Sequence, residues 1–287
     1  MSGNRLLALL AVAVSAFFPA IAAAGDGPIQ DNSFLVEEAY NQEPGVIQHI
    51  STFSRSRESG AWVYSFTEEW PVRGQTHQAS VTFGLVDLHA GPGTRGLGDV
   101  LLNYRWQAVG NGETPVAFAP RLSAVLPTGD ALHGLGNGGT GAEINLPLSV
   151  VLSDHFVSHT NLGGRLVPSA RTPSGNGNLA SFMIGQSVVW LAHHNFNFML
   201  EAAYSSTDIA AHGVNLRTEA LTVNPGLRAA LDIGGLQIVP GIAFPIGVGP
   251  SRGDNGLFLY LSFEHAFRLA GPPEVDASAK SSDAGRG

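Results

Sequence analysis

The sequence predicts an all-β fold, a transmembrane antiparallel β-barrel of about 12 strands with short periplasmic turns and longer external loops. The composition is one reason: 36 of the 287 residues are glycine, 17 are proline and only 13% are charged, which favours one large β domain over a helical enzyme. Alternation is the second reason, because apolar and polar residues take turns along many segments. The third is spacing, since each segment is close to the roughly ten residues that a tilted strand needs to cross a bilayer.

The segment 256–267, GLFLYLSFEHAF, shows the alternation most clearly. One face carries Leu257, Leu259, Leu261, Phe263 and Phe267, and the other carries Phe258, Tyr260, Ser262, Glu264 and Ala266. An apolar face suits lipid and a mixed face suits a lumen. The segment is similar to the closing strand of outer-membrane proteins, a resemblance that implies recognition by the barrel-assembly machinery. The chain continues past Phe267, and residues 268–287 are polar and rich in glycine, which predicts a disordered tail.

Residues 1–24 have the pattern of an export signal. Arg5 supplies the positive charge, residues 6–18 form an apolar core, and Ala22, Ala23 and Ala24 precede the expected cleavage. The core is too short for a good transmembrane helix, and no later stretch approaches eighteen consecutive apolar residues. A mature chain in a membrane must therefore span it as a closed barrel, in the outer membrane of a Gram-negative bacterium.

Charge and cysteine content exclude several classes of protein. The chain contains no cysteine, which removes disulfides, thiolate metal sites and cysteine nucleophiles. A net charge of -8 without any basic tract argues against nucleic acid as a partner. The expected partners are outer-membrane lipids and a small-molecule solute.

Residues 25–45 precede the first alternating segment and have no strand pattern of their own. We expect one helix-like turn from Ser33 to Tyr40, with Ser33 as its N-cap before Glu37 and Glu38. This segment lies on the periplasmic side, or folds into the lumen, or forms a loose arm.

The alternating segments define the barrel at residues 46–267. They are residues 46–55, 60–72, 77–88, 98–109, 115–126, 143–152, 155–167, 179–192, 195–205, 216–231, 236–246 and 256–267. A two-sheet sandwich would also alternate, so the gaps decide between the two folds. Apart from a brief first gap at 56–59, long gaps at 89–97, 127–142, 168–178, 206–215 and 247–255 alternate with short ones at 73–76, 110–114, 153–154, 193–194 and 232–235. Such a rhythm is typical of membrane barrels and predicts both termini in the periplasm.

Charged and amide side chains are expected to point into the lumen. They are Arg105, Arg121, Asn145, Asn161, Arg165, Asn197, Glu201, Asn224, Arg228, Gln237 and Glu264. We predict that Arg228, Gln237 and Glu264 form one hydrogen-bonded row across three strands. Of these residues, Arg105, Arg121, Glu201, Arg228 and Glu264 are the candidates for a solute path. The alternative is that such side chains only fill and rigidify a narrow barrel.

Four prolines lie within predicted strands. Pro120 and Pro147 fall at nearly equal height on neighbouring strands, and we expect Pro225 and Pro240 to repeat that arrangement. Each removes a donor from the ladder, which predicts bulges or kinks in the wall. One such notch is either a harmless bulge or a lateral exit for an apolar solute.

No motif indicates an enzyme, a metal site or a cofactor. Ser158 and His159 fall on opposite faces of a strand, which does not suit a nucleophile and its base. The pair His193 and His194 lies in a tight turn without nearby carboxylates, a weak metal signal. The glycine-rich segment 134–141 lacks the lysine and the strand–helix context of a phosphate loop.

Three motifs resemble a family of outer-membrane proteins named for the MetA pathway of phenol degradation. They are PIQDNSFLVEEAYNQEPGVIQHI at 28–50, GLGDVLLNYRW at 96–106 and PRLSAVLPTGD at 120–130. The resemblance covers nearly the whole mature chain and implies a transporter-like barrel linked to the breakdown of aromatic compounds. It transfers no catalytic residue.

Together these observations predict a channel for passive or facilitated uptake of small, aromatic or apolar solutes. The alternative is a structural or surface-binding barrel with a plugged lumen, and an outer-membrane lipid hydrolase is a third reading. An open path past Arg105, Arg121, Glu201 and Glu264 would support transport, whereas a plugged lumen would support the structural barrel.

Overall fold

The computed structural model describes residues 32–172, 175–211, 214–233 and 236–266, and these residues form one closed antiparallel β-barrel. Seven of its strands are continuous or nearly so: β1 (Val46–Ser56), β2 (Trp62–Arg73), β3 (His77–Asp87), β10 (Phe156–Thr172), β11 (Gly175–His193), β12 (Phe196–Ala211) and β17 (Gly256–Ala266). The other five are each interrupted: β4 (Arg95–Leu97) with β5 (Val100–Trp106), β6 (Val116–Phe118) with β7 (Arg121–Leu126), β8 (Gly141–Asn145) with β9 (Leu148–Ser153), β13 (Val214–Ala229) with β14 (Leu231–Ile233), and β15 (Leu236–Ala243) with β16 (Ile246–Gly247). These twelve strands confirm the predicted fold class.

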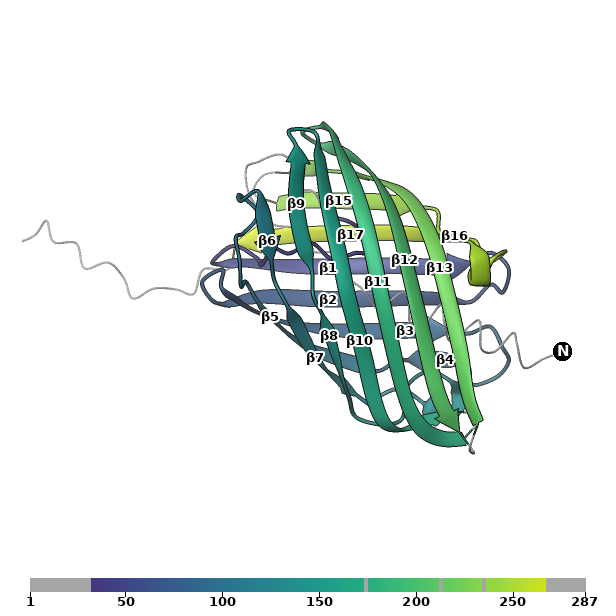
Figure 1. Ribbon diagram of the computed structural model, residues 1–287. Helices are drawn as coiled ribbons and strands as arrows, with labels where there is room; N and C mark the ends of the chain where they lie inside the picture. Colours follow the sequence, from purple (N-terminus) through teal and green to yellow (C-terminus); the bar gives the residue numbers. More distant parts are fainter. Residues whose placement is uncertain (1–31, 173–174, 212–213, 234–235, 267–287) are drawn as a thin grey trace, which may run out of the picture.

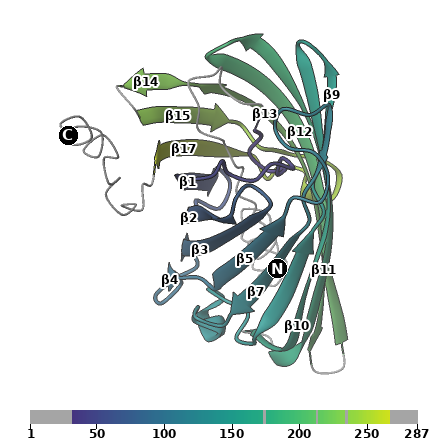
Figure 2. The ribbon, with the colours of Figure 1, turned by 90° about the vertical axis from the view of Figure 1, so that its left-hand side faces the viewer.

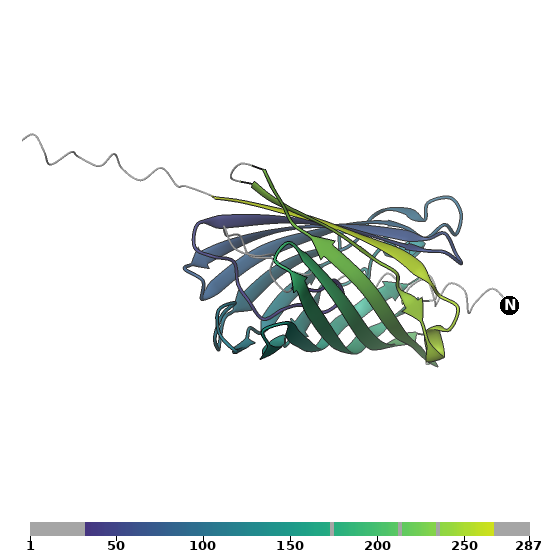
Figure 3. The same cartoon turned by 90° about the horizontal axis from the view of Figure 1, so that it is seen from above.

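Each strand pairs with the next along the chain, and the first and last strands close the ring (Figure 1). β1 and β17 pair without interruption from Val46 opposite Ala266 to Ser56 opposite Gly256. Seen from above, the purple β1 and the yellow β17 lie side by side (Figure 3). Closure leaves no open sheet edge, which is the condition for a sheet to stand in hydrocarbon.

The alternation of the sequence becomes the two surfaces of the wall. On β5, Leu102, Tyr104 and Trp106 are exposed on the outside, whereas Asn103 and Arg105 are buried inside. The outer face therefore offers large apolar side chains to lipid while the polar ones are kept in the lumen. Among the described residues, no helix is long and apolar enough to cross a membrane.

The strands β10, β11 and β12 are longer than predicted, and together with β13 they run at a steep tilt across the barrel (Figure 1). The long loops expected at 168–178 and 206–215 are wrong, because most of those residues extend two hairpins. Pro168 and Ser169 form a bulge inside β10, where the register shifts between Val167 and Ala170 and Ser169 has a φ of 57°. In the second hairpin, Arg217 pairs with Asp208 directly across the strands at 2.8 Å.

Candidate functional site: a lumen occupied by the N-terminal segment

Residues 32–45 lie inside the barrel, where we call them the plug segment. Figure 2 shows this segment as a dark purple trace within the curve of the sheet. Its residues from Asn32 to Gln42 are buried except for the half-buried Leu35. The helix-like turn predicted from Ser33 to Tyr40 is wrong, since the segment runs with bends and forms no helix. The reason is that its backbone N–H groups bond to side chains of the wall instead of to its own carbonyls.

The plug segment follows the inner wall from strand to strand instead of running straight along the axis. Wall residues that bond to it come from eight strands: β13, β12, β11, β10, β9, β7, β5 and β3. They are Arg228, Glu201, Ser187, Asn161, Ser149, Arg121, Arg105 and Gln78. One short segment thus touches most of the circumference, so it closes the lumen at the level where the predicted path residues lie.

Glu201 holds the start of the plug segment through a single oxygen. Its Oε1 accepts from the backbone N–H groups of Phe34, Leu35 and Val36 at 3.0, 2.7 and 3.0 Å. Asn224 donates to the other oxygen at 2.7 Å. Three consecutive amides converging on one carboxylate form an anion-binding concavity, which is here filled by the wall.

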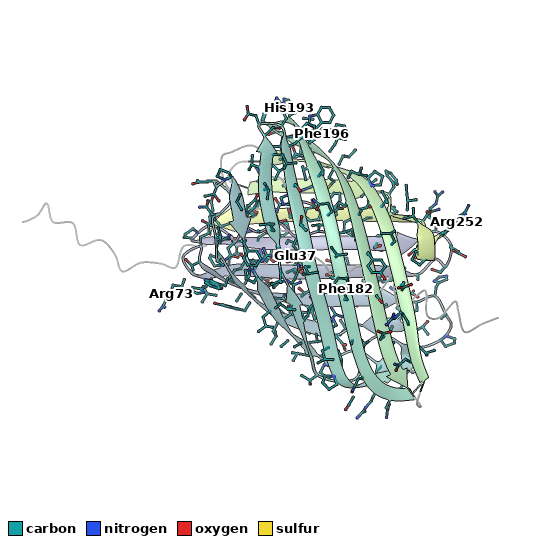
Figure 4. All side chains as sticks on the ribbon, viewed as in Figure 1. Glu37, Arg73, Phe182, His193, Phe196 and Arg252 are labelled. Carbon is teal, nitrogen blue, oxygen red and sulfur yellow. The ribbon has the colours of Figure 1, made fainter. Side chains whose placement is uncertain are left out.

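A buried charge cluster holds the middle of the plug segment. Arg105 donates to Oε2 of Glu37 at 2.6 Å, and Arg121 donates to Oε1 through Nη2 at 2.7 Å. Arg121 also reaches Glu143 at 2.9 Å, and Arg165 bonds to Glu143 through Nε at 2.8 Å. Figure 4 labels Glu37 well inside the barrel, between the end residues Arg73 and Arg252. Low-dielectric surroundings make these pairs costly to break once formed.

Phe34 anchors the plug segment in an apolar niche. Its ring lies 5.3 Å from that of Phe258 and 5.5 Å from that of Tyr260. Two glycines make room for it, because a Cβ on Gly226 or on Gly241 would lie 2.7 or 2.6 Å from the Phe34 ring. Substitution at either glycine would therefore push the ring out of its seat.

The end of the plug segment rests on a chain of amides and carboxylates. Gln78 accepts from the backbone of Gln42 at 2.7 Å and donates to Glu69 at 2.8 Å. Gln42 also contacts Gln48, which donates to Glu264 at 2.7 Å.

The predicted row of Arg228, Gln237 and Glu264 is wrong in one member. Gln237 is level with Glu264, but Arg228 is level with Gly241, which stands opposite Tyr260. Arg228 donates to the backbone oxygen of Asn32 at 2.6 Å and lies over the Tyr260 ring at 5.0 Å. Its bond partner is thus the plug segment.

The lumen residues expected from the strand phases all lie on the inner face. Ten of them are buried, and Gln237 is half-buried: the buried set is Arg105, Arg121, Asn145, Asn161, Arg165, Asn197, Glu201, Asn224, Arg228 and Glu264. Sequence reasoning missed Glu37, Gln78, Gln107, Ser149 and Ser187 as site residues. The wall members of that set could have been found by phase, since each lies on an inward position of a segment predicted from the sequence.

Two of the four prolines, Pro120 and Pro147, interrupt neighbouring strands at the same place in the wall. Pro120 lies between β6 and β7, and Pro147 between β8 and β9. Ala119 donates to the Pro147 carbonyl at 3.2 Å, and Pro147 has no N–H to return. Pro225 and Pro240 do not repeat this arrangement. The carbonyl of Pro225 accepts from the N–H of Phe244, which lies four positions after Pro240 in the sequence, so the two prolines are not at the same height.

Ser158 and His159, the nucleophile and base considered from the sequence, lie on opposite faces of β10. Ser158 is on the outer side and His159 is buried inside, where it shares a 2.8 Å hydrogen bond with Ser149. The Ser149 hydroxyl oxygen also accepts from the backbone of Ala39, so it is engaged by the plug segment. No group of three or more His, Asp or Glu side chains suitable for a metal ion occurs among the described residues. The rings of His193, at the end of β11, and of His194, in the turn that follows, lie 4.0 Å apart and are tilted by 41°.

Comparisons with known proteins identify the fold. No family model matches the chain, and no curated protein does. Among solved structures, the COG4313 outer membrane channel from Pseudomonas putida F1 is 12% identical, with a TM-score of 0.60 over 80% of this chain and 98% of that chain. The KdgM porin in complex with disordered oligogalacturonate is 7% identical, with a TM-score of 0.45 over 78% of this chain and 99% of that one. The chain therefore has the fold of outer-membrane β-barrels. With its apolar outer wall, this fold belongs in the outer membrane of a Gram-negative bacterium.

Proposed function

We propose that this protein is a gated outer-membrane channel through which small solutes pass when the plug segment leaves the lumen. The observation that carries the proposal is how the plug segment is attached. Among the described residues, no main-chain to main-chain hydrogen bond joins residues 32–42 to a strand. The hydrogen bonds described between the plug segment and the wall each involve a side chain, so the plug segment can leave while the ladders between the described strands stay intact.

The polar inner wall supports the same proposal. Once vacated, it would present arginines, carboxylates and amides that water and polar solutes can solvate. A core built only for stability is better served by apolar packing, because buried ion pairs are weak contributors to stability.

A plugged structural barrel is the second candidate, and one observation favours it. Arg105, Arg121 and Glu201 are bonded to the plug segment and are buried, with exposed fractions of 1%, 4% and 0%. On the criterion derived from the sequence, a closed lumen supports this candidate. The two differ in whether the plug segment ever moves.

For the solute we propose a small aromatic or apolar compound. The sequence resemblance to a barrel family linked to the breakdown of aromatic compounds supports this class. Passage would follow the gradient of the solute.

Single-channel conductance in a planar bilayer tests the proposal. Replacing Glu201 by alanine leaves three buried N–H groups without an acceptor, so we expect brief openings in the wild type and a larger open fraction in Glu201→Ala. Glu219→Ala is the matched control, because Glu219 is exposed and accepts from Tyr204 outside the lumen. Silence of the folded wild type and of Glu201→Ala would instead establish the plugged barrel.

A further inference from the structure

The charges around Glu37 do not balance within the wall itself. Arg105, Arg121 and Arg165 come from three strands, and the ion pairs of this group involve Glu143 from the wall and Glu37 from the plug segment. Glu69 is close enough to Arg105 and Arg121 for their charges to interact, but it forms no ion pair with either among the described residues and accepts from Gln78. Without Glu37, three buried guanidinium groups would face two carboxylates, those of Glu143 and Glu69. Such a surplus of positive charge attracts an anion.

The way in which Arg121 meets Glu37 specifies the kind of anion. Its Nε lies 3.1 Å from both carboxylate oxygens, and its Nη2 lies 2.7 Å from Oε1. This side-on fork fits a planar group with two oxygens. Arg105 adds a second bond at 2.6 Å, and nothing among the described residues accepts from its Nε. The site therefore fits a carboxylate, and the Nε–H of Arg105 is a further donor that a bound group could use.

An apolar niche lies beside this charge cluster. Arg105, which binds Glu37, also donates to the backbone carbonyl of Tyr40 at 3.0 Å. The Tyr40 ring packs with Ala117 and Ala119 and meets the ring of His159 edge-on at 6.2 Å. The plug segment thus presents a carboxylate and an aromatic ring to neighbouring parts of the wall.

We infer that Arg105 and Arg121 form a binding site for the carboxylate of a small organic acid, and that Glu37 is the internal stand-in that occupies it. The inference rests on the proposed function, because a solute reaches these arginines only when the plug segment moves. Its carboxylate competes with Glu37, so binding and opening are coupled. The two arginines would then select the solute as well as hold the plug segment.

Calorimetric titration of the purified full-length protein in detergent tests this site. Benzoate is the probe, and benzamide, which has the same ring without the charge, is the control. Glu37→Gln removes the competing charge and leaves the wall untouched, so it should bind benzoate on the order of tenfold more tightly than the wild type does. Benzamide affinity should be unchanged. Equal affinity for the two probes, or no gain in benzoate affinity on substitution, would overturn the inference.

A second variant examines the fork itself. Glu37→Gln combined with Arg121→Lys should lose the gain, because an ammonium group cannot make the side-on pair. Retention of the gain would contradict the assigned role of Arg121. If the double variant does not fold, cleavage of the wild-type plug segment after Glu37 and Glu38 by a glutamate-specific protease gives the answer. Benzoate should accelerate that cleavage and benzamide should not, whereas equal rates would contradict the site.

Failure of this inference is distinguishable from failure of the proposed channel. Conduction without benzoate binding would refute the carboxylate site and support the channel. Benzoate binding by a protein that never conducts would support the site and refute the channel.

Discussion

Individual side chains of the wall bind the backbone N–H groups of the plug segment, which in a sheet would be bound by the carbonyls of a neighbouring strand. Glu201, Asn161, Ser149 and Gln78 each accept from a backbone N–H of the plug segment. A hydrogen bond to a charged group contributes about 1.5–3 kcal/mol, and a neutral one contributes about 1 kcal/mol. The plug segment is therefore held by several separable bonds, each of which one substitution removes.

Phe34 is the apolar counterpart of these bonds, and its removal should loosen the plug segment. Phe34→Ala empties the niche between Gly226 and Gly241, a loss of about 3–5 kcal/mol for a buried phenylalanine. We expect faster cleavage after Glu37 and Glu38 by a glutamate-specific protease, read by mass spectrometry.

The matched control is Phe182→Ala, because Phe182 is exposed on the outer face. It should leave the cleavage rate unchanged. Gly241→Ala should give the Phe34→Ala result by crowding the ring instead of deleting it. Equal protection of all four proteins would show that Phe34 does not retain the plug segment.

At the scale of elements, the strand positions could be predicted because alternation fixes both the strand and its inner face. Arg105 and Glu264 point inward for that reason. The plug segment has no alternation, and its partners lie in distant strands, so its path could not be predicted. The extension of β10 was hidden because Pro168 and Ser169 indicate a turn, whereas paired strands on either side of them force a bulge.

The proline pair permits a test of the wall. Pro147→Ala supplies an N–H that can donate to the Ala119 carbonyl, which would stabilise the fold by about 1 kcal/mol. The same substitution makes the unfolded chain more flexible, which would destabilise the fold by about 0.4–1 kcal/mol. We expect stability in urea to change by less than about 1 kcal/mol. Uptake of an apolar probe should not change, and Pro120→Ala and Pro240→Ala should behave likewise. Lower uptake in these variants would show that a proline notch is a lateral exit.

At the scale of the whole molecule, the proposed gating needs a rigid ring and a removable segment. The ring is closed by continuous pairing of β1 with β17, so it does not need the plug segment to be complete. The chain passes from the plug segment into β1 through a turn at Gly45, which directly precedes the strand. The φ of Gly45 is 80°, a conformation that suits glycine. In the proposed gating, the plug segment moves and the barrel does not.

A reversible cross-link between plug and wall tests this claim most directly. The Ser33 and Ser187 hydroxyls are hydrogen-bonded to each other, and the chain has no cysteine, so Ser33→Cys with Ser187→Cys provides one disulfide pair without competitors. Single-channel conductance should vanish when the pair is oxidised and return on reduction, while each single variant conducts in both conditions. Equal conductance of the oxidised and reduced pair, with the cross-link verified by mass spectrometry, would contradict the account.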